Sequence, residues 1–262
     1  MRAVAVVGSL TSDVVAGGEP RVGGAPYYAA TALRVLGRPS LIVTRCAEAD
    51  RPALLPRLVA QGTPVEWLPA ERTYRYRLDY RGSEREMTVD EVAEPWTPGP
   101  WLDLLRPYAA VHVGALAIGE FPPATLAALA RGRRLSLDGQ GLVRVASTGP
   151  LRLEAHADPE VLRHVAILKL SEEEADALTG DGDVASLGVA EVVVTHGPNG
   201  STVHAGGTVE HVPAVPVEGA EPIGTGDAFA VAYLVSRTAG LRPAAAARRA
   251  TAVVAELLVR RR

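Results

Sequence analysis

The sequence predicts an α/β fold built on a mostly parallel sheet with helices on both faces. Short apolar runs alternate with longer amphipathic, alanine- and leucine-rich stretches along the chain, the order typical of β-α-β units. A length of 262 residues, with 47% hydrophobic and 22% charged residues, suffices for one large globular domain. We therefore expect residues 1–262 to form a single domain.

Each expected element follows from a local pattern. Strands are expected where short apolar runs occur, at 4–7, 41–44, 111–113, 135–137, 165–168 and 192–195. Helices are expected where apolar residues recur at helical spacing, at 26–36, 52–60, 123–130, 172–178, 227–238 and 243–259. Gly37 and Gly62 follow the first two helices, as expected of helix ends.

One segment breaks this alternation. Residues 73–80 alternate with period two, residues 81–84 offer a turn, and residues 85–89 return. The pattern indicates a hairpin with one polar face, unlike strands that are buried on both faces. We predict a small lid hairpin outside the main sheet at about 73–90. An edge hairpin without a functional role is the simpler alternative.

Composition excludes several classes of protein. The net charge of −3 gives no reason to expect a nucleic-acid partner. The single cysteine, Cys46, cannot form an intramolecular disulfide and fits a reducing cytosol. No segment approaches the ~20 apolar residues of a membrane span, and the run 4–7 fits a first strand better than a signal peptide. We predict a cytoplasmic protein with no membrane partner.

The most informative segment joins a glycine loop to a helix. Gly224 and Gly226 allow a tight turn and close approach of backbone N–H groups to a ligand. The helix that follows would direct unpaired N–H groups, those of Thr225 and Gly226 among them, and its positive dipole end toward an anion. Asp227 beside such a site suits a base in phosphoryl transfer to a hydroxyl. The structural alternative is an aspartate that merely starts a helix.

Two further segments follow the first predicted strand. Asp13 can accept hydrogen bonds from sugar-type hydroxyls, although an aspartate in a turn would look the same. Gly23 and Gly24 precede Pro26, and the pair permits either close ligand approach or an ordinary turn into a helix.

Two more segments follow later strands, at the edge where open α/β sheets bind ligands. Ser171 and Glu174 have the spacing of a capping box, which explains both residues without a metal role for Glu174. Residues 195–200 carry glycines three apart and fit a nucleotide-binding loop or a hairpin turn. P-loop, dinucleotide and zinc motifs are absent from the sequence.

Taken together, these segments resemble the PfkB (ribokinase-like) carbohydrate kinase family over essentially the whole chain. Residues 23–30 with Gly37 are similar to its amino-terminal signature, and residues 221–229 to its more specific carboxyl-terminal one. Residues 169–174 lie where the family has an Asn-x-x-Glu motif, and residues 195–200 match its nucleotide loop. The resemblance implies a three-layer α/β/α fold with a small, reduced β lid.

The resemblance also implies an ATP-dependent kinase that uses Mg²⁺ and acts on a hydroxyl of a small polyol, sugar or nucleoside. Asp227 would be the general base, and the backbone from Gly224 through Thr225 and Gly226 would bind the transferring phosphoryl group. Glu174 would order Mg²⁺ through water. The nucleotide-binding residues would be Lys169, Thr195, Gly197 and Gly200, and the substrate-binding residues Asp13, Gly23, Gly24, Tyr28 and Gln140.

Several positions depart from the family pattern. Tyr28 and Ser171 stand where asparagine is common, and Glu221-Pro222 replaces the Asp-Thr of a monovalent-cation site, which leaves potassium dependence open. The short segment between Asp13 and Gly23 predicts a reduced or missing lid strand, so that a monomer and a homodimer both stay possible. Ser171, the aromatic after Gly-Gly and Asp138-x-Gln140 are similar to the myo-inositol kinase-like branch, although a pentose or nucleoside acceptor also fits.

Two other interpretations of the function stay open. A ligand-binding or regulatory protein with this fold and little kinase activity is favoured by the departures at Tyr28, Ser171 and Glu221. A hydrolase with Asp227 as nucleophile is chemically possible, but it gives the loop at 195–200 no role.

Overall fold

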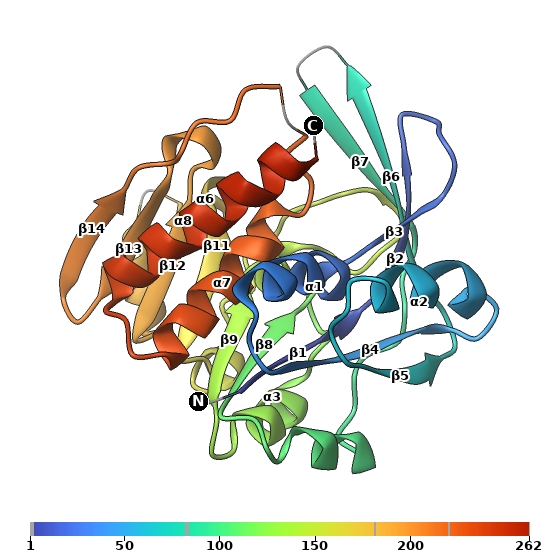
Figure 1. Cartoon of the computed structure of the whole chain (residues 1–262), viewed down its shortest axis with the longest axis horizontal. Helices are drawn as coiled ribbons and strands as arrows, with labels where there is room; N and C mark the ends of the chain where they lie inside the picture. Colours follow the sequence, from blue (N-terminus) through green and yellow to red (C-terminus); the bar gives the residue numbers. More distant parts are fainter. Residues whose placement is uncertain (1–2, 82–83, 181, 220, 262) are drawn as a thin grey trace.

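The computed structural model describes residues 3–81, 84–180, 182–219 and 221–261. Within them, a nine-stranded sheet forms the middle of three layers (Figure 1). Its order is β14-β13-β12-β11-β9-β8-β1-β4-β5. The strands are β1 (Val4–Ser9), β4 (Ser40–Ala47), β5 (Val65–Ala70), β8 (Ala110–Gly114), β9 (Arg134–Asp138), β11 (Ile167–Ser171), β12 (Glu191–Thr195), β13 (Ser201–Ala205) and β14 (Thr208–Val212). All neighbours are parallel except the pairs β12–β13 and β13–β14. The mostly parallel α/β sheet predicted from the sequence is confirmed.

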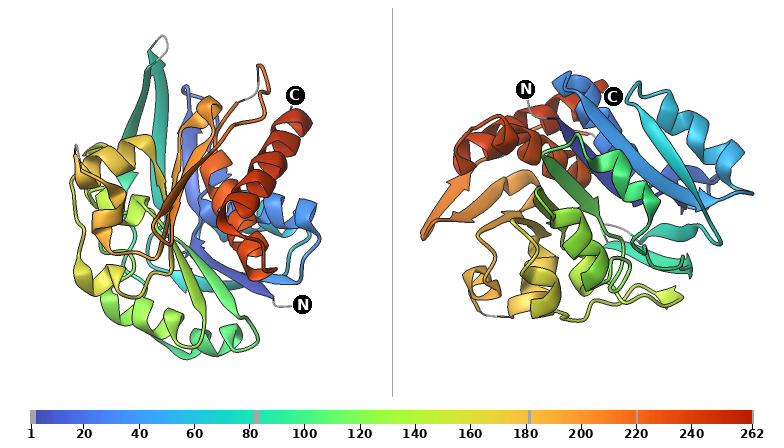
Figure 2. Two further views of the ribbon diagram at one scale, coloured as in Figure 1. Left: turned by 90° about the vertical axis from the view of Figure 1, so that its left-hand side faces the viewer. Right: turned by 90° about the horizontal axis from the view of Figure 1, so that it is seen from below.

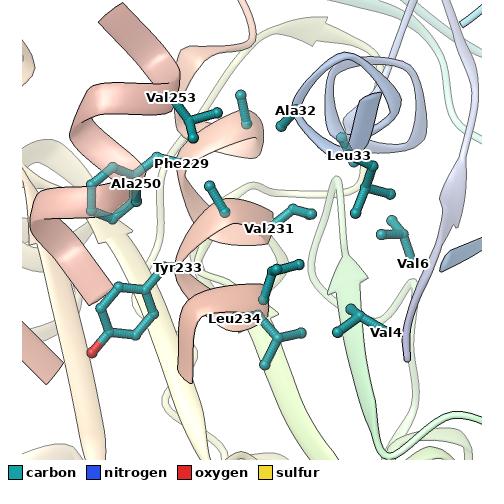
Figure 3. Close-up of a cluster of buried hydrophobic side chains, with 14 of the residues drawn as sticks. Val4, Val6, Ala32, Leu33, Phe229, Val231, Tyr233, Leu234, Ala250 and Val253 are labelled. Atoms are coloured by element: carbon teal, nitrogen blue, oxygen red, sulfur yellow. The ribbon is translucent and has the colours of Figure 1, made fainter. Parts of the chain in front are cut away.

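Helices cover both faces of this sheet, as the edge-on views show (Figure 2). One face carries α1 (Ala25–Leu36), α2 (Arg51–Val59), α7 (Thr225–Thr238) and α8 (Pro243–Arg260). The other carries α3 (Pro123–Ala130), α5 (Pro159–Leu162) and α6 (Glu172–Thr179). Helix α7 is buried along most of its length because it lies between the sheet and α8. Figure 3 shows its apolar side chains against β1, α1 and α8. The sheet and its helices thus hold the amino end of α7 in a fixed position.

A second, five-stranded sheet stands outside the main one, in the order β10-β7-β6-β2-β3. It consists of β2 (Thr11–Val15), β3 (Arg21–Gly23), β6 (Tyr74–Arg81), β7 (Glu84–Glu91) and β10 (Gly149–Pro150). The hairpin expected at 73–90 corresponds to β6 and β7, and its turn includes residues 82–83, which lie outside the described residues. We call this second sheet the lid sheet.

The lid sheet is larger than the sequence suggested. Residues 11–15 pair in parallel with β6, and residues 21–23 pair with residues 11–13. The lid strand expected to be reduced or missing is present in reduced form, as the three-residue β3.

Other element boundaries also differ from expectation. The strand expected at 165–168 lies at 167–171, so Lys169 lies within β11 rather than after it. Helix α7 begins at Thr225, two residues earlier than expected. Strands β5, β13 and β14 were not predicted, and β14 is exposed along most of its length, so it lacks an apolar run. Within the described part of the chain, no helix has the length and apolar composition needed to cross a bilayer.

Candidate active site

A cleft of about 490 Å³ lies where the carboxyl ends of β1, β9, β11 and β12 meet the lid sheet. It collects most of the site residues expected from the sequence. These are Asp13, Gly24, Tyr28, Gln140, Lys169, Glu174, Thr195, Gly197, Gly224, Thr225, Gly226 and Asp227. Ligand sites of open α/β sheets lie at this edge, and the cleft is therefore the candidate active site.

Two expected residues lie just outside the cleft lining. Gly23 packs against Asp13, since a Cβ atom there would lie 1.9 Å from Asp13 Oδ2. Gly200 packs against the strand behind the loop, since its Cβ would lie 2.1 Å from the carbonyl oxygen of Val212. Both glycines make room for neighbouring protein atoms, and Gly200 also lines a neighbouring pocket of about 330 Å³ that adjoins the cleft. Their contacts to a ligand stay predictions.

The loop before α7 has the geometry of an anion site. Gly224 adopts a left-handed conformation with φ of 72°, which suits glycine. The amide and the hydroxyl of Thr225 both donate to the carbonyl of Pro222, at 3.2 and 2.8 Å. The first turn of a helix has N–H groups without intrahelical acceptors, and Gly226 and Asp227 in that turn line the cleft. Their N–H groups and the helix dipole can stabilise a phosphoryl group.

Asp227 is a buried acid whose pKa lies well above the usual range of an aspartate. Burial, with added repulsion from Asp138 and Glu174, raises its pKa to about 7, although Lys169 and Arg144 oppose the shift. A carboxylate with a pKa near the working pH is suited to general base catalysis.

A buried ion cluster lies directly behind this loop. Lys169 Nζ is 3.5 Å from Asp138 Oδ2 and 4.0 Å from Glu174 Oε2, and all three side chains are almost fully buried. Burial alone would lower the pKa of Lys169, but the carboxylates of Asp138, Glu174 and Asp227 outweigh it and raise the pKa to about 12. A Cβ atom on Gly226 would lie 2.9 Å from Lys169 Nζ. A permanent positive charge therefore lies beside the anion loop.

Glu174 has the structural role that its spacing predicted. Its Oε2 accepts from the Ser171 amide at 2.8 Å, and its own amide donates to Ser171 Oγ at 3.2 Å, which completes a capping box. Within the described residues, no group of three or more histidine, cysteine or acidic side chains can hold a metal ion by itself. The capping box therefore accounts for Glu174 Oε2, and a role of Glu174 in binding Mg²⁺ through water stays a prediction.

The opposite end of the cleft presents unsatisfied oxygens. Asp13 Oδ1 and Thr11 Oγ1 are buried and have no hydrogen-bond partner in the described residues, although both residues line the cleft. Burial raises the pKa of Asp13 to about 6. Buried polar atoms without partners are costly, so hydroxyl groups of a bound ligand would stabilise this end of the cleft.

The chain was compared with known proteins. The model of the pfkB family carbohydrate kinases matches residues 67–262. The chain belongs to this family. A fructokinase of Klebsiella pneumoniae is 28% identical over 273 residues, which cover 89% of this chain and 84% of the relative. These matches confirm the resemblance seen in the sequence and identify a carbohydrate or polyol kinase.

Solved structures of related kinases superpose on nearly the whole chain. A pyrophosphate-dependent kinase in the ribokinase family, complexed with a pyrophosphate analogue and myo-inositol, is 26% identical with a TM-score of 0.84, covering 98% of this chain and 95% of that one. The ribokinase of Arabidopsis thaliana, complexed with ribose and ATP, is 19% identical with a TM-score of 0.75, covering 98% and 93%. These similarities confirm the ribokinase-like fold of this pfkB-family kinase.

Arg144 is a charged residue of the kinase cleft that was not predicted from the sequence. Arg144 follows the short helix α4 (Gln140–Val143) and lines the cleft. Its charge acts on Asp13 and on Asp227, at both ends of the site. It belongs to no motif, and its position four residues after Gln140 is the only signal in the sequence.

Tyr28 lies against the anion loop of this pfkB-family kinase. A Cβ atom on Gly224 would lie 2.0 Å from two carbons of the Tyr28 ring. The ring thus rests on the Gly224 backbone. Because Tyr28 also lines the cleft, its predicted contact with a bound substrate stays a prediction. The tyrosine that replaces the common asparagine supports the loop.

Gly224→Ala tests this contact. The new methyl group must displace Tyr28, and alanine disfavours the left-handed conformation, so we expect about 1–3 kcal/mol of destabilisation and a loss of kcat on the order of 10²-fold. Thermal unfolding and initial rates measure the two effects. Gly207→Ala is the matched control, because Gly207 has φ of +75° and a Cβ atom there would meet nothing within 4 Å. Equal effects of both variants would contradict a role for the ring contact.

Proposed function

We propose that this pfkB-family kinase transfers the γ-phosphoryl group of ATP to a hydroxyl of a small polyol or sugar, with Asp227 as general base. The observation that carries the proposal is a carboxylate of pKa about 7 in the first turn of α7, beside an anion loop. The acceptor hydroxyl would give its proton to Asp227 while its oxygen bonds to the γ-phosphorus. The bond from that phosphorus to the ADP oxygen breaks, and ADP leaves.

The charges around the cleft support this reaction. Phosphoryl transfer depends mainly on positioning and on electrostatic stabilisation of the phosphate oxygens. Lys169 and Arg144 both act on Asp227 and would attract the donor phosphates. Mg²⁺, when bound to those phosphates, would neutralise further charge, and Glu174 is the residue that would hold it through water.

A neighbouring pocket favours a nucleotide as donor. It measures about 330 Å³ and shares Thr195, Gly197, Thr225 and Gly226 with the cleft. Its remaining lining is mainly apolar and includes Val215, Phe229, Val254 and Leu258. Such a surface suits a nucleoside, while the phosphates would extend to the anion loop.

Pyrophosphate is the second candidate donor. It is suggested by the kinase that is 26% identical and was solved with a pyrophosphate analogue. Lys169 and the anion loop could bind it, but it would leave the apolar pocket empty. We therefore favour ATP, and a direct comparison of donors decides between the two.

A cross-panel of donors and acceptors tests the proposed function. ATP, GTP and pyrophosphate are each combined with myo-inositol, fructose, ribose and adenosine, with Mg²⁺ present, and products are identified by phosphorus NMR. We expect a phosphate ester to form from ATP and a polyol or sugar, with donor consumption that requires the acceptor. Binding without transfer would favour the ligand-binding alternative. Phosphate release from phosphorylated compounds without a donor would favour the hydrolase.

Asp13→Asn tests the acceptor end of the cleft. Asparagine keeps the shape but removes the charge, so hydrogen bonds from acceptor hydroxyls weaken by about 1–2 kcal/mol. We expect the acceptor KM to rise on the order of 10-fold, with a smaller change in the donor KM. Asp79→Asn, on the lid strand β6 but outside the cleft lining, is the control. A larger effect on the donor KM than on the acceptor KM would mean that Asp13 contacts the donor and not the acceptor.

A further inference from the structure

A second cavity of about 400 Å³ lies among β3, α1, the end of α2 and the end of α8. Figure 1 shows these three helices on the same side of the main sheet, with the end of α8 marked by the C label. Among the described residues, five arginines line the cavity, namely Arg21, Arg34, Arg57, Arg260 and Arg261, and Glu221 is the one acid of that lining. We call it the arginine pocket.

Most of this positive charge has no compensation within the pocket. Arg21 pairs with Glu221 at 3.1 Å, and Arg260 pairs with Glu256 on its own helix. For Arg34 and Arg57, the described part of the chain offers no ion-pair partner. The protein as a whole carries a net charge of −3, so the concentration of cations does not follow from composition.

The helix dipole explains why each arginine lies at the end of its own helix, but it does not explain why three of them gather around one cavity. Arg34, Arg57 and Arg260 each lie in the last turn of a helix, where the dipole favours a cation. That effect requires no neighbour. Three such helix ends converge on one cavity, so their arginines form a cluster of like charge around it, and an anion bound there would be attracted by all three.

We propose that the arginine pocket binds a small polyanionic phosphate compound, at a site that adjoins the candidate active-site cleft and shares Tyr28 and Ile223 with it. Guanidinium groups match phosphate oxygens in bidentate geometry. Arg34 and Arg57 are available for one phosphate, and Arg261 for a second. The volume suits a molecule of the size of a sugar bisphosphate. Because it rests on the pocket alone, this inference is independent of the proposed kinase mechanism.

The arginine pocket is connected to the anion loop through Tyr28 and Ile223, which line both cavities, and through Arg261, which contacts both residues. Arg261 donates to the carbonyl of Ile223 at 2.6 Å, and its guanidinium lies 5.7 Å from the centroid of the Tyr28 ring. Tyr28 in turn rests on Gly224. An anion that attracts Arg261 would compete with these contacts, so occupancy of the pocket would alter the loop that binds the transferring phosphoryl group.

Calorimetric titration with fructose 1,6-bisphosphate tests the site, at physiological salt so that weak surface attraction is screened. We expect Arg34→Ala/Arg57→Ala to weaken binding at least about ten-fold, which corresponds to about 1.4 kcal/mol. Arg131→Ala/Arg248→Ala removes the same charge from exposed positions outside the pocket and should bind as the wild type does. Circular dichroism checks that both double variants fold.

Three results would overturn the site. They are no binding to the wild type at millimolar ligand, equal binding to both double variants, and equal weakening in both. The connection to the loop has its own readout, because the bisphosphate should change the donor KM of the wild type and of the control. An unchanged donor KM in the wild type, at saturating bisphosphate, would overturn that connection.

Discussion

Asp227→Asn should lower kcat/KM on the order of 10²- to 10⁴-fold, the range typical for loss of a general base. Asparagine has nearly the same shape but cannot accept the proton of the acceptor hydroxyl. The backbone of the anion loop is unchanged, so we expect donor binding to remain. Initial rates and donor titration together separate loss of chemistry from loss of binding. Turnover near the wild-type level would exclude Asp227 as the base.

The pH dependence provides a second check on the same residue. Since the pKa of Asp227 is raised to about 7, the carboxyl group holds a proton below that pH and cannot act as a base. The kcat/KM of the wild type should therefore rise with pH through about 7, and the residual activity of Asp227→Asn should lack this rise. Asp176→Asn, at an exposed position on α6, should retain both the rate and the profile.

The stability of Asp227→Asn separates the chemical role from a structural one. A carboxyl group whose pKa is raised in the folded state is less favourable when charged in the fold than in the unfolded chain. At pH above about 7 the neutral asparagine removes this cost. We therefore expect the Tm of the variant at pH 8 to equal or exceed that of the wild type. A lower Tm would indicate that Asp227 stabilises the loop.

The main sheet was predictable from the sequence because its central strands are buried on both faces and read as continuous apolar runs. The lid sheet was only partly predictable. Residues 11–15 pair in parallel with β6, about sixty positions later in the chain, and nothing local in Thr11-Ser12-Asp13 marks that pairing. Strand β14 is exposed along most of its length, so its residues lack the apolar run that indicates a strand.

The residues of the candidate site were also only partly predictable from the sequence. Asp227 and its flanking glycines were found because a turn, a helix start and an acid lie within four consecutive residues. Arg144 was missed because it enters the cleft from a loop, and its effect on Asp13 and Asp227 depends on the folded chain. Tyr28 was noticed, but its support of Gly224 depends on contact between residues far apart in sequence. A short loop motif can be recognised from neighbouring residues in the sequence, whereas a contact between residues far apart in the chain cannot.

Lys169→Met should cause the largest loss of stability among these variants. The side chain of Lys169 is 6% exposed, and its ammonium group is the ion-pair partner of Asp138 Oδ2, a buried oxygen that has no hydrogen-bond partner among the described residues. Removal of the lysine charge therefore leaves the buried Asp138 carboxylate without this partner. Removing one partner of a buried ion pair typically costs about 3–5 kcal/mol. For a chain of this size we expect Tm to fall on the order of 10 °C, as measured by calorimetry.

The donor KM should rise in the same variant, because Lys169 Nζ lies beside Gly226 in the anion loop. The double variant Asp138→Asn/Lys169→Met separates the two effects. Without a charge on residue 138, the missing ammonium group leaves a smaller burial cost, so the double variant should recover part of the lost stability, with a coupling of about 1–3 kcal/mol. Donor affinity should stay low, because the positive charge beside the loop is still absent. Recovery of both properties would mean that Lys169 acts only by neutralising Asp138, and recovery of neither would mean that the two side chains are not coupled.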